Sequence, residues 1–404
     1  MNIPRFSIRS RFLAVLALLA VPSLAPGQGT ITNVRAAQRA GTNLVDIDYD
    51  VTGTTQPLKI TLEVSADDGT TYNIPATSLS GAAGANVTPG PNLRLTWDAG
   101  KDWGGRFSTT MRYKVVADDA PAVPAGFALI PAGPFQMGDQ SSPLVGDNNE
   151  LPVHTVQVSA FYMGKYEVTK EEWDAVRTWG LANGYTDLAA GNGSYASKGA
   201  NHPVHSITWY DMVKWCNARS QKEGLTPCYT VSGATYKTGQ SAPECNWNAN
   251  GYRLPTEAEC EKAARGGASG KNFPWGTDTI THSQANYYSS SSYAYDVSPT
   301  RGYHPTYAVG GSPYSSPVGS FAPNGYGLDD MAGNMWEWCW DWYGSYAAGS
   351  QTDPRGATSG ANRVVRGGSW NGDADYCRVA FRGSVFPTVA FYSIGFRVAR
   401  SPVP

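Results

Sequence analysis

Residues 336–342 read Trp-Glu-Trp-Cys-Trp-Asp-Trp, and this strict alternation constrains the fold more than any other feature of the chain. Successive side chains of a strand point to opposite faces, so the alternation places four indoles on one face. Glu337, Cys339 and Asp341 then share the other face. The indole face predicts packing against an apolar layer. The polar face has two interpretations, a solvated acidic surface or a set of oxygen ligands for a cation.

The chain before this region has a different pattern. Residues 29–118 alternate with period two and show no helical period. Residues 45–51 alternate apolar side chains with aspartates, residues 58–64 repeat the pattern, and the pair Asp68-Gly69 is typical of a hairpin turn. Several short strands of this kind predict a small all-β sandwich of the immunoglobulin or fibronectin type. We interpret it as a spacer or adhesive module.

The first residues, 1–28, resemble an export signal. Three arginines precede a short apolar run at 12–20, and small residues follow where a peptidase can cut. The run breaks at Pro22, short of the ~20 apolar residues that a membrane-spanning helix needs. These features predict an exported protein, periplasmic, cell-surface or secreted, with no transmembrane segment.

A Pro/Ala-rich linker is predicted at residues 119–126, and residues 127–402 form the second domain. Thr169, Thr208 and Thr256 are each followed three residues later by an acidic residue, which is typical of a helix N-cap with its capping box. The segments between these helices are rich in Gly, Ser, Asn, Pro and Tyr. We therefore predict an α+β domain with few helices and long loops.

Charge and cysteine content limit the classes of function. The net charge is −2, so no basic field attracts nucleic acid. Six cysteines in an exported chain indicate disulfides, although spacing alone does not choose the pairs. Cys228 and Cys245 flank a Gly/Ser/Thr-rich stretch that a disulfide between them would close. Cys216 and Cys260 fall in helical patterns and are interpreted as buried apolar residues.

Ordered motifs along residues 127–400 carry a resemblance to a known family. They include Tyr-Arg-Leu-Pro-Thr-Glu-Ala-Glu at 252–259, Gly-Asn-Met-Trp-Glu-Trp at 333–338, Arg-Gly-Gly-Ser-Trp at 366–370 and Gly-Phe-Arg at 395–397. The order resembles that of the formylglycine-generating enzymes, also called sulfatase-modifying factors. The resemblance implies a loop-rich variant of the C-type lectin fold.

The resemblance also implies an active site. In that family two cysteines, five residues apart, bind one copper ion and oxidise a cysteine or serine of a sulfatase-type client to formylglycine. Cys377 matches the second cysteine, but Gly372 stands at the first position. Ser369 and Trp336 match other residues of the active-site region. Because Cu(I) selects thiolates, Cys377 alone is a poor copper site.

Three interpretations of Cys377 remain open from the sequence. It forms a structural disulfide, with Cys339 as the preferred partner, or it is a free buried thiol, or it is a remnant catalytic cysteine.

The matching family segments also bind calcium, as hard oxygen ligands on irregular loops do. Carried over, the first set comprises the side chains of Asp330 and Glu337 and the carbonyls of Gly333 and Met335. The second set comprises Asn286, the Tyr287 carbonyl and Asp296.

Two functions follow from these predictions. The chain is an exported formylglycine-generating oxidase with a sulfatase-like client, or it is a calcium-stabilised, lectin-like module that binds a peptide or a glycan without copper chemistry.

Overall fold

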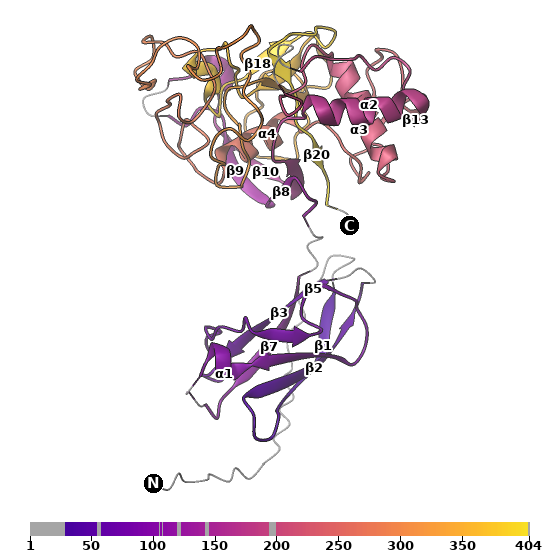
Figure 1. Cartoon of the computed structure of the whole chain (residues 1–404), viewed down its shortest axis with the longest axis vertical. Coiled ribbons are helices and arrows are strands. Elements are labelled where there is room, and N and C mark those ends of the chain that lie inside the picture. The colour runs from indigo at the N-terminus through magenta and orange to yellow at the C-terminus, as the bar shows by residue number, and fades with distance from the viewer. Residues whose placement is uncertain are drawn as a thin grey trace. The chain divides into compact units, whose positions relative to one another are not determined.

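The computed structural model describes residues 29–54, 58–104, 106, 108–118, 123–141, 145–193 and 199–402 (Figure 1). The chain divides into two compact units, with the boundary between residues 121 and 122. The predicted export signal and residues 119–122 of the predicted linker lie outside the described residues. Within these ranges, no helix has both the length and the apolar character needed to cross a membrane.

The first unit contains two antiparallel sheets and one short helix, α1 (Ala99–Asp102). The four-stranded sheet has, in spatial order, β1 (Thr30–Gln38), β2 (Leu44–Thr52), β6 (Leu93–Asp98) and β4 (Leu79–Gly81). The three-stranded sheet has β5 (Gly84–Val87), β3 (Leu58–Ser65) and β7 (Arg112–Asp118).

Alternation along these strands produces the core of the first unit, as predicted. Ile47 on β2 and Leu95 and Trp97 on β6 are fully buried in one apolar cluster that both sheets share. The intervening aspartates face outward, where Asp46 pairs with Arg39 at 2.8 Å. The assignment to the immunoglobulin or fibronectin type stays a prediction.

The described residues of the second unit form small sheets, three α-helices and long loops. Its helices are α2 (Lys170–Ala182), α3 (Trp209–Lys222) and α4 (Glu257–Arg265), with 3-10 turns η1 (Asn148–Glu150) and η2 (Ala374–Cys377). Its strands are β8 (Phe127–Ile130), β9 (Gly133–Met137), β10 (His154–Val158), β11 (Phe161–Gly164), β12 (Tyr229–Val231), β13 (Ala234–Thr235), β14 (Glu244–Cys245), β15 (Trp336–Trp342), β16 (Gln351–Thr352), β17 (Arg363–Arg366), β18 (Gly383–Val385), β19 (Ile394–Gly395) and β20 (Ala399–Arg400). The sheet β18-β17-β15-β19 carries the residues that flank the candidate site.

The three predicted helix starts are confirmed. Thr169, Thr208 and Thr256 each accept a hydrogen bond from the third helical N–H, and the acidic side chain at that position bonds back to the threonine N–H. These reciprocal bonds satisfy N–H groups that the first turn of a helix otherwise leaves free. Gly266, in the left-handed conformation with φ 56°, ends α4.

Strand β15 has the predicted two faces, but its acidic face is not solvated. Glu337, Cys339 and Asp341 are all buried. Asp341 accepts a hydrogen bond from the N–H of Glu257, the first residue of α4, at 2.9 Å. The interpretation of this face as a solvated acidic surface is therefore wrong, because α4 covers it. On the other face, Trp340 stacks on Tyr229 with ring centroids 5.3 Å apart.

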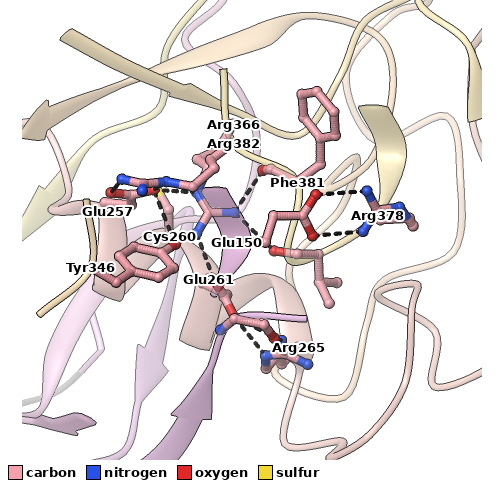
Figure 2. A network of polar contacts seen from close by, with 12 residues as sticks. Glu150, Glu257, Cys260, Glu261, Arg265, Tyr346, Arg366, Arg378, Phe381 and Arg382 are labelled. Carbon is pink, nitrogen blue, oxygen red and sulfur yellow. Dashed lines mark hydrogen bonds and ion pairs between the residues drawn. The ribbon is translucent and has the colours of Figure 1, made fainter. Parts of the chain in front are cut away.

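Helix α4 is the centre of a buried network of ion pairs (Figure 2). All nine of its residues are buried, including its glutamates. Glu261 pairs with Arg366 at 2.5 Å and with Arg265 at 2.7 Å. Glu257 pairs with Arg382 at 2.6 Å. The network continues to η1 through a two-pronged pair between Glu150 and Arg378, 2.7 Å on each prong.

Replacing Glu261 by alanine should destabilise the second unit strongly, because Arg265 and Arg366 stay buried without that carboxylate. We expect a loss of about 3–5 kcal/mol in the free energy of unfolding. Asp174→Ala on α2 removes a more exposed ion pair with Lys170 and should cost less than ~1 kcal/mol. Urea unfolding followed by tryptophan fluorescence measures both, and equal losses would contradict the assigned role of the network.

Candidate functional site

The segment that follows β17 folds tightly on itself. Gly368 has a φ of 75°, and a Cβ placed there would lie 3.1 Å from the Cys377 Sγ and 2.9 Å from the Tyr376 carbonyl oxygen. Only glycine meets both demands without strain. The Gly372 N–H donates to the Ser369 carbonyl at 3.0 Å. The predicted residues Ser369 and Cys377 are thus brought together with Gly372 in one compact turn.

Cys377 lies at the end of η2 and is 1% exposed. It packs in an apolar cluster with Phe273, Ile280 and Tyr287. Burial raises the pKa of its thiol, and the nearby carboxylate of Asp296 raises it further. Because the thiolate is the nucleophile and the metal ligand, burial and a raised pKa both make Cys377 less reactive than an exposed thiol.

The predicted disulfide between Cys377 and Cys339 is not found. Cys339 packs in a different cluster, against Cys260 and Val364, with its Sγ 3.2 Å from the Cys260 Sγ. All six cysteines are free thiols in the structure, so the predicted link between Cys228 and Cys245 is absent as well. For Cys377, a free buried thiol is the interpretation that matches the structure. The prediction that Cys216 and Cys260 are buried is confirmed.

Ser369 and Trp336 take structural positions in this turn. Ser369 is fully buried, and its Oγ donates to the Asn371 Oδ1 at 2.9 Å. Trp336 is half-buried and packs on the ring of Tyr376, with centroids 5.6 Å apart. Catalytic roles for Ser369 and Trp336 stay predictions.

A group of aromatic rings beside Gly372 was not predicted. The Tyr288 N–H donates to the Gly372 carbonyl at 2.9 Å, and ring contacts of 4.9–5.8 Å link Tyr288 through Tyr303 to Trp370 and Tyr392. Tyr314 completes the group by packing on Tyr303 and Trp370. Tyr303 is 41% exposed and Tyr392 48% exposed, while Trp370 is buried beneath them. We call these five residues the aromatic platform.

A cluster of buried charged side chains lies under the loop that leads into β15. Arg397 pairs with both oxygens of Glu337, each at 2.6 Å. Asp330 accepts the Gly319 N–H through Oδ2 at 2.5 Å, but its buried Oδ1 has no partner within the described residues. Burial raises the pKa of Asp330 to about 7. Burial and the nearby Asp330 also raise the pKa of Glu167. Glu167 was not among the site residues predicted from the sequence.

Comparison with known proteins identifies the second unit. The model of the sulfatase-modifying factor enzyme 1-like domain matches residues 113–402. The formylglycine-generating enzyme of Thermomonospora curvata is 32% identical over 299 residues, covering 69% of this chain and 94% of that protein. The chain belongs to the sulfatase-modifying factor family. Its resemblance to the formylglycine-generating enzymes is confirmed.

Relatives in this family have different names. The formylglycine-generating enzyme of Mus musculus is 31% identical over 375 residues, covering 86% of this chain and 93% of that protein. The chaperone protein LppX of Paenibacillus barcinonensis is 32% identical over 255 residues, covering 61% and 82%. Among solved structures, Treponema denticola variable protein 1 shares 32% identity at a TM-score of 0.52, with 68% of this chain and 95% of that chain covered.

A copper site of the family's two-thiolate kind does not fit this member. Gly372 offers no donor atom, and a Cβ placed there would lie 2.9 Å from the Tyr376 ring. Cys377 is buried with a raised pKa, and the nearest partner of Cys339 is Cys260. Copper(I) needs soft, deprotonated ligands, and no second thiol accompanies Cys377.

Calcium ligation by the first predicted set stays a prediction: Asp330 has a buried oxygen without a partner in the described residues, whereas Arg397 binds both oxygens of Glu337. Asn286 lies beside this set, because the Asn334 N–H donates to its carbonyl at 2.7 Å. The Asn286 Oδ1, the Glu167 Oε2 and the Asp330 Oδ1 are all buried without partners within the described ranges. Hard oxygen donors of this kind are what calcium requires. No three described His, Cys, Asp or Glu side chains form a metal-holding group by themselves, so carbonyls such as those of Gly333 and Met335 would have to contribute.

The second predicted set has protein partners of its own. Asp296 accepts hydrogen bonds from the Tyr287 hydroxyl at 2.7 Å and from Ser289, and it lies 3.1 Å from the Arg301 guanidinium. The Tyr287 carbonyl oxygen lies 3.2 Å from the His282 Nε2. Calcium ligation by this set stays a prediction.

Proposed function

We propose that the second unit is a binding module of the sulfatase-modifying factor family that holds a segment of a protein client without oxidising it. The observation that carries this proposal is that Cys377 is buried while a glycine, Gly372, stands where the family has its other cysteine. The family's oxidation chemistry needs two thiolates, and this chain supplies one buried thiol whose pKa is raised by burial.

The aromatic platform gives such a module its binding surface. Its exposed tyrosines are joined by ring contacts to Tyr288, whose N–H donates to the carbonyl of Gly372, the position that matches the family's missing cysteine. Aromatic rings with polar tips supply large contact areas at little conformational cost and are enriched where proteins bind partners. The exposed amide of Asn371 and the half-buried carboxylate of Asp373 adjoin the platform and add hydrogen-bonding groups for a polar ligand.

The names of the relatives support a module that binds a protein client without oxidising it. LppX is named a chaperone protein, which favours a binding role for this chain as well. The formylglycine-generating enzymes act on sulfatase-type proteins, so a protein segment is the ligand class that the family favours. With the predicted export signal at 1–28, the client would be met outside the cytoplasm.

We also propose that the second unit binds calcium as a structural cofactor. Asp330, Glu337 and the carbonyls of Gly333 and Met335 would hold it, with Asn286 and Glu167 as further oxygen donors. A divalent cation there neutralises carboxylates that Arg397 alone does not balance. It would hold the loop that leads into β15, whose Asn334 carbonyl accepts the Trp370 N–H at 2.8 Å.

The platform can be tested with a cysteine-containing peptide from a sulfatase-type client, and with soluble oligosaccharides as the alternative ligands. We expect the peptide to bind and to be recovered without an aldehyde. Tyr303→Ala and Tyr392→Ala should each weaken binding roughly tenfold, as loss of an aromatic contact worth about 1.4 kcal/mol does. Tyr72→Ala, which removes an equally exposed tyrosine of the first unit, should have no effect. Calorimetry measures the affinities, and formylglycine in the recovered peptide would contradict the proposal.

Calcium removal gives a second test. Chelation should lower the melting temperature of the second unit by roughly 8 °C if about 4 kcal/mol of binding energy is lost. Asp330→Asn should remove this sensitivity, whereas Asp341→Asn, at a buried acid that α4 already satisfies, should keep it. Calorimetric scans with and without chelator decide the point, and identical wild-type scans would exclude calcium.

A further inference from the structure

Cys260 and Cys339 form a hydrogen bond between two thiols in the described part of the chain. The Cys339 thiol donates to the Cys260 sulfur, with the two Sγ atoms 3.2 Å apart. A disulfide bond is about 2.05 Å long, so bonding requires the sulfurs to approach by only ~1.2 Å. The residues are 79 positions apart in sequence, so neither thiol is placed there by local chain geometry.

Both thiols are fixed by rigid elements. Cys260 lies on α4, whose residues are all buried, and Cys339 lies in the middle of β15. The Trp209 indole N–H donates to the Cys339 carbonyl at 2.9 Å and anchors that strand. Val364 and the half-buried Tyr343 enclose the pair in a small apolar cluster. The two sulfurs are therefore held in register by the fold itself.

We infer that Cys260 and Cys339 form a disulfide that joins α4 to β15. The oxidant is a thiol–disulfide exchange partner, either a disulfide-bearing oxidoreductase or a small-molecule disulfide such as oxidised glutathione. One thiolate attacks the oxidant's S–S bond, which gives a mixed disulfide and releases the oxidant's first sulfur as a thiolate. The second thiolate then attacks the mixed disulfide and releases the oxidant's other sulfur as a thiolate, and both leaving thiolates take up the protons of the cysteines. Two protons and two electrons pass from the cysteines to the oxidant, and one S–S bond replaces another.

Burial determines when this exchange takes place. Both side chains are almost completely shielded from solvent, and burial raises the pKa of the Cys339 thiol. A shielded, protonated thiol exchanges slowly, so oxidation belongs to the stage of folding before α4 closes over β15. The same shielding then protects the finished bond from reductants.

The bond would strengthen the buried network at its centre. It lies one residue from Glu261 on α4 and two residues from Glu337 on β15. Closing a loop of this length constrains the unfolded chain, which stabilises the folded state. This inference does not depend on the proposed binding function, because neither thiol belongs to the aromatic platform.

Refolding in a glutathione redox buffer, followed by unfolding in denaturant with an alkylating agent and peptide mapping, tests the inference. We expect one cross-linked peptide that joins Cys260 to Cys339, with Cys377 and the three other cysteines alkylated. Full alkylation of Cys260 and Cys339, or a cross-link from either to another cysteine, would overturn it.

Melting temperatures provide an independent readout. The oxidised protein should melt roughly 10 °C above the same protein that has been unfolded, reduced with a strong dithiol reductant and refolded with the reductant present, because unfolding exposes the bond. Cys260→Ala and Cys339→Val should each melt at the same temperature with and without reductant. Cys216→Ala is the matched control at a buried helical cysteine and should keep the full difference. A wild-type melting temperature that reductant leaves unchanged would also overturn the inference.

Discussion

Buried arginines bonded to both carboxylates and loop carbonyls are the interaction on which the second unit depends. Arg366 pairs with Glu261 on α4 and also donates to the carbonyls of Val379 and Phe381. Arg397 pairs with Glu337 and extends to the loop carbonyl of Lys165. Long loops expose many carbonyls that no ladder satisfies, and a guanidinium has five N–H donors to offer them. The arginines thus replace the regular secondary structure that the loops lack, while the carboxylates balance their buried charge.

This framework also determines the character of the candidate site. Arg366 and Arg378 hold the two ends of the turn that contains Gly372 and Cys377. The turn is drawn inward far enough to bury Cys377, and the space beside Gly372 is taken by the Tyr376 ring. The aromatic platform keeps exposed tyrosines and carries no group poised for oxidation, and we propose it as the surface that binds a ligand. Membership in an enzyme family and absence of the family's copper site are therefore compatible.

Sequence patterns predicted the elements whose causes are local. The three threonine caps, the alternation of β2 and the two faces of β15 each arise from neighbouring residues, and each was found. Contacts between distant segments were not predictable in the same way. The alternation of β15 could not show that α4 would cover its acidic face, nor that Cys339 would face Cys260 rather than Cys377. The tyrosines of the platform come from separate loops, so only the tyrosine-rich composition of that region hinted at them.

Copper(I) binding tests the central claim, that Cys377 is a structural thiol, most directly. Wild-type protein and Cys377→Ser are titrated anaerobically against a chromophoric Cu(I) chelator, in buffer that keeps the other thiols reduced. The account predicts that the folded wild type withdraws no more copper from the chelator than the variant does. Stoichiometric withdrawal by the wild type that disappears in Cys377→Ser would show that this thiol is accessible and ionises, and would contradict the account.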